Sequence, residues 1–396
     1  MPLQCHPHGQ ISIPRDSSSR ESAPSLRSLD GTTEPERALG SDTQQMIAQT
    51  PRQVLEIDGS LGEGGGQVLR TSLALALITG QPIFMTNMRR RRANPGLMAQ
   101  HLKAVEAAGA VGMAKIEGAQ LGSQTLSFHP SGIRPGEFRF DIGTAGSTSL
   151  VLQAIVPPLS FADSGSIVTL IGGTHVPRSP CFQFLELHWV PYMQRIGYNV
   201  QLELETAGFY PRGGGCVHAA VQPASTVSPL RLTNRGALKR IRGFSAVANL
   251  PSSVAERQKQ QALRSLGELS SVSEIEILAL ESPSKGTVLM LLAEFENSRC
   301  CFFGLGARGK PAERVADEAV DELLDFLATD GAIDHYLADQ LMLPLALVPE
   351  VSELRTSKVT RHLTTNAEIV RMFLPVNITI DGETGQPGSV RISRTA

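Results

Sequence analysis

The stretch Val54-Leu55-Glu56-Ile57-Asp58-Gly59-Ser60-Leu61-Gly62-Glu63-Gly64-Gly65-Gly66-Gln67 indicates how this chain folds. Its first five residues predict a short strand, and the glycines that follow predict a loop. An almost wholly apolar helix is expected from Gln67 to Thr79, ended by Gly80. A glycine loop between a strand and a helix N-terminus is a place where backbone N–H groups can hold a phosphate.

Similar units recur along the chain. A predicted strand at 138–142 leads to the glycine-containing loop 143–148 and an apolar helix, and a strand at 167–171 leads to Gly172-Gly173-Thr174 and a helix around 182–192. A third glycine-rich turn spans 208–215. Repeated strand, glycine loop and helix units predict an internally repeated α/β (α+β) domain.

Two other parts of the chain differ from this pattern. Residues 1–52 are rich in Ser, Pro, Arg, Gln and Thr and lack hydrophobic periodicity, so a disordered N-terminal extension is expected there. Segment 236–328 has the order β-α-β-β-β-α, which predicts a small inserted domain. The large, catalytic domain would then comprise residues 53–235 plus 329–396.

Composition limits the classes of function. The chain has 396 residues, 41% hydrophobic, and no apolar run long enough to cross a bilayer. Its formal net charge of −2 argues against a protein that coats long nucleic acid, so any nucleic-acid contact is expected to be local, for example at a strand end. Five cysteines without a C-x-x-C pattern and without a secretory segment favour a reducing cytoplasm.

The second decisive stretch surrounds His362. Residues 358–362 alternate like a strand, and Thr365 with Glu368 predicts a capping box that opens a helix. His362 would then lie just before a helix N-terminus, where a phosphate is favoured and where a neutral imidazole can attack phosphorus. The alternative is a structural histidine at a strand end, hydrogen-bonded to backbone.

Glu63 is the informative residue of the first loop. The loop is neither a Walker motif nor a Rossmann fingerprint, because no Gly-Lys-Ser/Thr follows and Gln67 replaces the last glycine. A carboxylate beside a polyphosphate repels it unless a divalent cation lies between them, so Glu63 is a candidate contact for Mg²⁺ or Mn²⁺. The alternative is a solvated carboxylate in a turn.

Several further polar residues are candidates for phosphate or nucleotide contacts. Arginine suits bidentate phosphate binding, and it occurs at Arg70 and in the run 89–92, although four consecutive arginines also suit an exposed loop. His101 borders the apolar stripe that Met98, Leu102 and Val105 are expected to form on their helix, so it could be purely structural. The helical stretch Tyr336-Leu337-Ala338-Asp339-Gln340 could simply be polar surface beside an apolar run.

Together these motifs closely resemble the RNA 3′-terminal phosphate cyclase family over about residues 54–393. Seven motifs of the family occur in this sequence. They are G-E-G-G-G-Q-x-L-R at 62–70, R-x-x-R-x-x-P-G-L at 89–97, Q-H-L at 100–102, G-T/S-A-G-S at 143–147 with a downstream Gln at Gln153, G-F-Y-P-x-G-G-G at 208–215, Y-L-A-D-Q-L at 336–341 and H-L-x-T-N at 362–366. The sequence departs from the family pattern at Arg90, Arg91, Asn94 and the segment 175–177.

The resemblance implies a fold and an activity. The large domain would contain three repeated βα units similar to the C-terminal domain of translation initiation factor three, and the insertion would be thioredoxin-like. The activity would be that of a ligase that converts an RNA 3′-terminal phosphate to a 2′,3′-cyclic phosphodiester, consuming ATP and releasing AMP and pyrophosphate. It would proceed through a covalent histidine–AMP and then an RNA–AMP anhydride.

The resemblance also implies roles for residues. His362 would be the nucleophile through Nε2, and Glu63 would approach the metal. Nucleotide contacts would come from Gln153, Tyr336, Leu337, Ala338, Asp339 and Gln340. Phosphates of ATP or of the RNA end would be held by Arg70, Arg89, Arg92, Gln100 and His101.

Two competing functions remain open at this point. A non-catalytic relative acting as a scaffold in ribosomal RNA maturation would lack the nucleophilic histidine, which is present here. An enolpyruvyl transferase on a similar repeated fold would need phosphoenolpyruvate-binding signatures, which the sequence does not contain.

Overall fold

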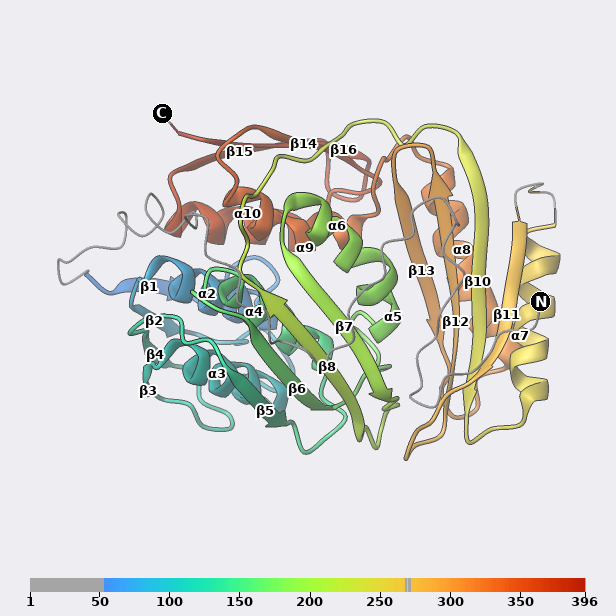
Figure 1. Cartoon of the computed structure of the whole chain (residues 1–396), viewed down its shortest axis with the longest axis horizontal. Coiled ribbons are helices and arrows are strands. Elements are labelled where there is room, and N and C mark those ends of the chain that lie inside the picture. Colours follow the sequence, from blue (N-terminus) through green and yellow to red (C-terminus); the bar gives the residue numbers. More distant parts are fainter. Residues whose placement is uncertain (1–52, 268, 270–271, 396) are drawn as a thin grey trace.

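The computed structural model describes residues 53–267, 269 and 272–395 (Figure 1). The expected N-terminal extension, 1–52, lies outside the described residues. Within them the chain is a mixed α/β protein with four four-stranded sheets, so the α/β part of the predicted fold class is confirmed.

The first unit is built on the opening stretch of sequence. It contains β1 (Leu55–Asp58), α2 (Gly66–Thr79), β2 (Ile83–Thr86), α3 (Ala99–Gly112), β3 (Lys115–Glu117) and β4 (Leu126–His129). Its sheet has the order β1-β2-β4-β3, with β1 and β2 parallel and the other pairs antiparallel. The helix α2 ends where the sequence predicts, because Gly80 adopts the left-handed conformation (φ 66°) that closes a helix.

Two more units repeat this strand order. The second contains β5 (Glu137–Asp141), α4 (Thr148–Leu159), β6 (Ser166–Gly172), the helical run α5 (Phe182–Phe184), η1 (Leu185–Trp189) and α6 (Val190–Ile196), β7 (Asn199–Thr206) and β8 (Gly215–Gln222). The third contains β9 (Arg231–Leu232), α9 (His335–Ala346), β14 (Ser352–Thr356), α10 (Arg361–Phe373), β15 (Val376–Asp381) and β16 (Gly388–Arg394). Their sheets run β5-β6-β8-β7 and β9-β14-β16-β15, and in each the first pair is parallel and the others antiparallel.

The third unit is interrupted between β9 and α9. The intervening segment contains β10 (Leu238–Ala248), α7 (Ser252–Ser265), β11 (Val272–Ala279), β12 (Gly286–Phe295), β13 (Arg299–Leu305) and α8 (Ala312–Leu327), in the predicted β-α-β-β-β-α order. Its sheet runs β11-β10-β12-β13, and a separate hydrophobic cluster lies between this sheet and its helices. Because β9 pairs with β14, the chain returns to the same sheet after the interruption (Figure 1).

The helices of the three units pack against one another and place the site. Helix α2 contacts both α4 and α10, and α10 also contacts α9. Eleven of the fourteen α2 residues are buried, which explains why this helix is apolar on almost every side. Each fully buried leucine in it, such as Leu73 or Leu75, contributes about 1.5–3 kcal/mol of hydrophobic stabilisation.

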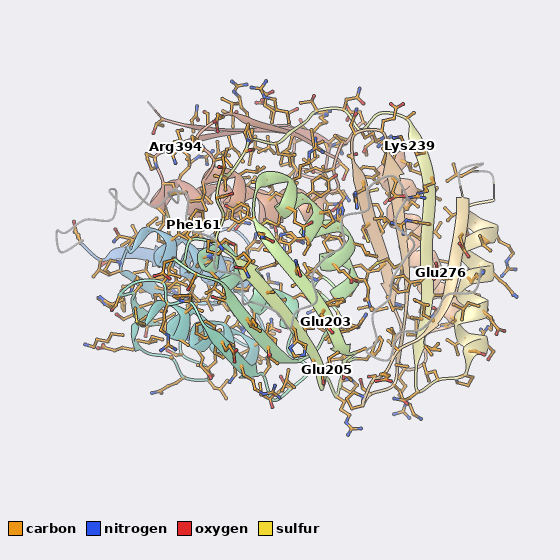
Figure 2. The ribbon with its side chains drawn as sticks, viewed as in Figure 1. Phe161, Glu203, Glu205, Lys239, Glu276 and Arg394 are labelled. Carbon is orange, nitrogen blue, oxygen red and sulfur yellow. The ribbon has the colours of Figure 1, made fainter. Side chains whose placement is uncertain are left out.

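No helix in the described ranges combines the length and the apolar character that a bilayer crossing needs. Figure 2 draws side chains on the ribbon and labels Glu203 and Glu205 on β7.

Candidate active site

His362 lies inside the first turn of α10, whereas the sequence predicted that it would lie before the helix began. Helix α10 begins at Arg361, and Thr360 is its N-cap, with its hydroxyl accepting a hydrogen bond from the Leu363 N–H at 3.1 Å. The capping box expected from Thr365 and Glu368 is therefore wrong. Thr365 instead donates its hydroxyl to the Arg361 carbonyl at 2.6 Å, because it is already in the helix.

The orientation of the imidazole is set by Gln67 at the start of α2. The Gln67 amide nitrogen donates to a carboxylate oxygen of Asp339 at 2.5 Å. A carboxylate can only accept, so the amide oxygen must face the other way, where it contacts His362 Nδ1. Nδ1 must then carry a proton, and in the neutral ring the lone pair lies on Nε2.

Glu63 approaches the other nitrogen of the same ring. Its carboxylate lies 3.1 Å from His362 Nε2, a contact that needs a proton on this nitrogen because a carboxylate can only accept, and 3.5 Å from an Arg92 guanidinium nitrogen. The loop comes this close because Gly62 has φ 55° and no side chain; a Cβ there would lie 1.9 Å from the Thr365 hydroxyl. The His362 side chain is 48% exposed and Glu63 is 31% exposed, so a ligand can reach both.

A buried hydrogen-bond network holds Gln67 in place beside His362. Asn366 donates its amide to the Asp339 carboxylate at 2.5 Å and accepts from the Thr71 hydroxyl at 2.7 Å. Burial raises the pKa of Asp339 to about 6, and burial also lowers the pKa of Arg70 to about 10, with the Asp339 charge opposing that shift. These hydrogen bonds join the first unit to the third unit beside the cavity.

These side chains line one cavity of about 580 Å³ between the three units and the inserted segment. Of the residues predicted from the sequence, those that line it are His362, Glu63, Arg70, Gln153, Tyr336, Asp339 and Gln340. Leu337 and Ala338 belong to the same helix but are fully buried in the core, so their side chains are not part of the lining.

The remaining predicted phosphate contacts lie outside the cavity lining. Arg89 donates to the backbone carbonyls of Asn94 and Gly96, each at 2.8 Å, which braces its own loop. Gln100 accepts from the Ser147 N–H at 3.4 Å. None of Arg89, Arg92, Gln100 and His101 is among the residues that line the cavity.

His101 is nevertheless close to a group that does line the cavity. A Cβ on Gly66 would lie 2.4 Å from His101 Nε2 and 2.8 Å from an Arg70 guanidinium nitrogen, so both side chains meet at the start of α2. Burial lowers the pKa of His101 to about 3, with Arg70 and Arg89 adding to the shift. Its Nδ1 accepts from the Met98 N–H at 3.2 Å, so the neutral ring carries its proton on Nε2, the side facing Arg70.

The chain matches known proteins over most of its length. A family model described as RNA 3′-terminal phosphate cyclase matches residues 61–380. The chain belongs to this family. Curated relatives named RNA 3′-terminal phosphate cyclase include one from Ralstonia nicotianae, 45% identical over 84% of this chain and 95% of that protein. Another, from Thermococcus kodakarensis, is 41% identical over 86% of this chain and 98% of that protein.

A search of solved structures gave a weaker result. An enolpyruvyl transferase from Streptomyces tendae aligns with 87% of this chain and 49% of its own, at 10% identity and a TM-score of 0.36.

Gln67, Asn366 and Arg178 are among the cavity residues of this cyclase-family chain for which the sequence predicted no role. Gln67 and Asn366 lie inside the quoted motifs, and a buried amide at the start of an apolar helix is a signal for a polar partner. Arg178 also lines the cavity, from the loop after β6, where it adopts φ 64°. No pattern in the sequence distinguishes Arg178 from an ordinary surface arginine.

Proposed function

We propose that this chain is an ATP-dependent RNA 3′-terminal phosphate cyclase that carries AMP covalently on His362. The observation that carries the proposal is the pair of contacts on one imidazole, in which Gln67 holds Nδ1 and leaves Nε2 facing a cavity beside Glu63. A histidine that is merely structural would not need its tautomer fixed and its other nitrogen left accessible.

The cavity contains polar atoms that suit a nucleotide base. Gln153 Nε2, Gln340 Oε1 and Trp189 Nε1 line it and are buried, and none has a hydrogen-bond partner among the described residues. Buried polar atoms without partners are uncommon in native proteins and mark places where a ligand completes the hydrogen bonding. Two donors and one acceptor match the mixed donor and acceptor edge of adenine.

A divalent metal fits beside the same nitrogen. Mg²⁺ is typically held by one or two carboxylates together with substrate phosphates, and Glu63 is a partly exposed carboxylate at the cavity mouth. When bound there, Mg²⁺ or Mn²⁺ would neutralise charge on the triphosphate. Glu63 would then turn from His362 towards the cation, and the proton on Nε2 would pass to solvent, which frees the Nε2 lone pair for attack.

The first chemical step would be nucleotidyl transfer to His362. The Nε2 lone pair attacks the α-phosphorus of ATP, an N–P bond forms, and the bond to pyrophosphate breaks. The ring becomes positively charged, and its Nδ1–H donates to the Gln67 oxygen, whose amide is polarised by the Asp339 carboxylate. Arg70 and Arg178 would offset negative charge on the phosphates.

Two further steps would complete cyclisation. An oxygen of the RNA 3′-phosphate attacks the phosphorus on His362, and the imidazole leaves as AMP passes to the RNA. The neighbouring 2′-OH then attacks the RNA phosphorus, loses its proton, and expels AMP. This last step is intramolecular, so proximity supplies much of its rate. Arg89, Arg92, Gln100 and His101 would position the RNA end from the rim.

The finer expectations on fold and location remain proposals of the same kind. The shared strand order of three sheets supports repeated units similar to the C-terminal domain of translation initiation factor three. The segment between β9 and α9 would be the thioredoxin-like insertion, with domain boundaries at about 235 and 329. A cytoplasmic location would suit an RNA-processing enzyme.

Labelling with α-³²P-ATP and Mg²⁺ tests the covalent step directly. The chain should acquire label that survives alkali and is lost in acid, as expected of a histidine phosphoramidate. His362→Ala should acquire none, whereas His129→Ala, a histidine of β4 that contacts Ser127, should label normally. Equal labelling of His362→Ala would overturn the assignment. Protection of an RNA 3′-phosphate from phosphatase after incubation with ATP tests cyclisation itself.

A further inference from the structure

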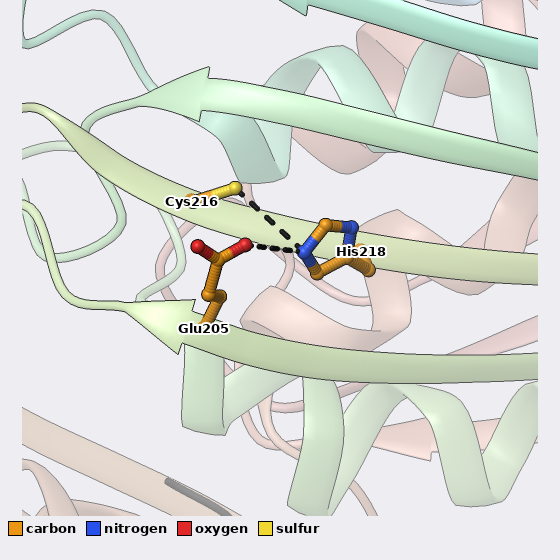
Figure 3. A group of neighbouring side chains, drawn as sticks. All are labelled: Glu205, Cys216 and His218. Carbon is orange, nitrogen blue, oxygen red and sulfur yellow. Dashed lines mark hydrogen bonds and ion pairs between the residues drawn. The ribbon is translucent and has the colours of Figure 1, made fainter. Parts of the chain in front are cut away.

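A second cluster of metal-ligating side chains lies on the sheet of the second unit. Glu205 of β7 and Cys216 and His218 of β8 point towards one another on the same face of this sheet (Figure 3). One ligand atom from each lies within 4.8 Å of the others. None of the three lines the cavity around His362, so the proposed cyclase chemistry makes no use of them.

The local structure aims these three residues at one point. Cys216 and His218 are two residues apart on a strand, so both side chains project from the same face. The pairing of β7 with β8 shifts register between Leu204 and Thr206, which leaves Glu205 as the extra residue of a bulge. Bulges of this kind redirect a side chain, and here the Glu205 carboxylate lies 2.7 Å from His218 Nε2.

Both partners converge on the same ring nitrogen. Cys216 Sγ lies 3.8 Å from His218 Nε2, the atom that Glu205 also contacts. A nucleophilic thiol relay would need the thiol and the carboxylate on opposite nitrogens of the ring. Convergence of sulfur, oxygen and nitrogen on one point is instead the arrangement of ligands around a metal ion.

The distances suit a tetrahedral ion. Zinc–sulfur and zinc–nitrogen bonds of about 2.3 and 2.05 Å at a tetrahedral angle separate S and N by about 3.6 Å, close to the 3.8 Å found. The N···O distance would have to open from 2.7 Å to about 3.4 Å, a small movement for the exposed Glu205 side chain. On its other side, His218 Nδ1 lies 3.1 Å from the Thr169 hydroxyl, an outer partner of the kind that orients a metal-bound histidine.

We propose that Glu205, Cys216 and His218 bind a zinc ion or another borderline-soft divalent cation, with a fourth position left for water or an exogenous ligand. Thiolate and carboxylate together balance the charge of Zn²⁺, and the mixed ligand set disfavours Mg²⁺. The ion would join β7 to β8 at the bulge. Two residues beyond Glu205, the Ala207 N–H donates to the Glu281 carbonyl of the inserted segment at 2.8 Å, so the ion would also stiffen this contact.

Cobalt substitution of the full-length chain provides the test. After removal of metals with a chelator, one equivalent of Co²⁺ should produce the intense near-ultraviolet charge-transfer absorption of a cobalt thiolate, and Zn²⁺ should displace it. Cys216→Ser should abolish this absorption. Glu205→Gln, at an exposed position, should keep the fold and weaken binding at least about tenfold. Thr169→Val should weaken binding by about 10–100-fold, as loss of an outer partner does.

Matched variants separate this site from the others. His129→Gln and Cys5→Ser should bind cobalt as the parent chain does, and so should His362→Ala, which also makes the outcome independent of the cyclase proposal. The proposal is overturned if the parent chain shows no charge-transfer absorption at micromolar Co²⁺. It is equally overturned if the absorption persists in Cys216→Ser, because the thiolate ligand would then be another cysteine.

Discussion

Replacing Gln67 with methionine should impair the transfer of AMP to His362 without emptying the nucleotide site. The substitution keeps the length of the side chain and removes both polar atoms. It removes the acceptor for His362 Nδ1–H and the donor to the Asp339 carboxylate. The imidazole is then free to place its proton on Nε2, where no lone pair remains for attack.

The size of the effect follows from the two lost contacts. A hydrogen bond to a charged group contributes about 1.5–3 kcal/mol and a neutral one about 1 kcal/mol, so the transition state should lose about 3 kcal/mol. That corresponds to about a 100-fold lower rate of labelling at saturating ATP. The affinity for ATP should change by less than about threefold, because the triphosphate contacts assigned to Arg70 and Arg178 remain.

The assay is single-turnover labelling with α-³²P-ATP, together with nitrogen NMR of the chain carrying labelled histidine. Gln201→Met, an exposed position on β7, is the matched control and should label at the parent rate. In Gln67→Met, the NMR signal of His362 should move towards the tautomer protonated on Nε2. A labelling rate within about threefold of the parent, with an unchanged tautomer, would refute the assigned role of Gln67.

Three further substitutions test other parts of the site. Burial raises the pKa of Asp339 from 3.8 to about 6, so the folded chain holds this proton more tightly than the unfolded chain. The free energy of unfolding should therefore fall by up to about 3 kcal/mol as the pH rises from about 4 to above 6. Asp339→Asn should remove that loss. The urea concentration at the midpoint of unfolding should therefore rise at about pH 7.5 but not at about pH 4. Gly62→Ala places a Cβ 1.9 Å from the Thr365 hydroxyl and should lower labelling at least about tenfold, whereas Gly309→Ala, with the same sign of φ and no atom within 4 Å, should not. Gln153→Leu should weaken ATP binding about tenfold, measured by calorimetry, without lowering stability, because it removes a buried donor that has no partner.

Local patterns in the sequence were sufficient for elements whose ends are set by a single residue. Helix α2 stops at Gly80 because only a residue that tolerates a positive φ ends the helix there. The segment between β9 and α9 follows the predicted element order because its strands and helices have clear and different periodicities. The motifs also include Glu63, Gln153 and Gln340, which line one cavity although they are far apart along the chain.

The start of α10 could not be predicted in the same way. Thr360 and Thr365 are equally suitable caps in isolation, and Glu368 favours the second. Tertiary contacts decide between them. The Val359 N–H donates to the Gln386 carbonyl, and the Val359 carbonyl accepts from the Gly385 N–H, so the extended backbone is held up to this point. The helix can therefore begin immediately afterwards and include His362.

The role of Gln67 illustrates why residue type alone does not identify such a site. Its amide is neutral, and nothing in the sequence says which way the oxygen points. That direction is fixed by the Asp339 carboxylate, which comes from the third unit and accepts a hydrogen bond from Asn366 of α10 as well. The proposed reactivity of His362 would therefore depend on how α2 packs against α9 and α10. A substitution that shifts this packing by a fraction of an ångström would alter the tautomer of His362 while leaving the fold intact, so labelling is a more sensitive probe of this interface than stability.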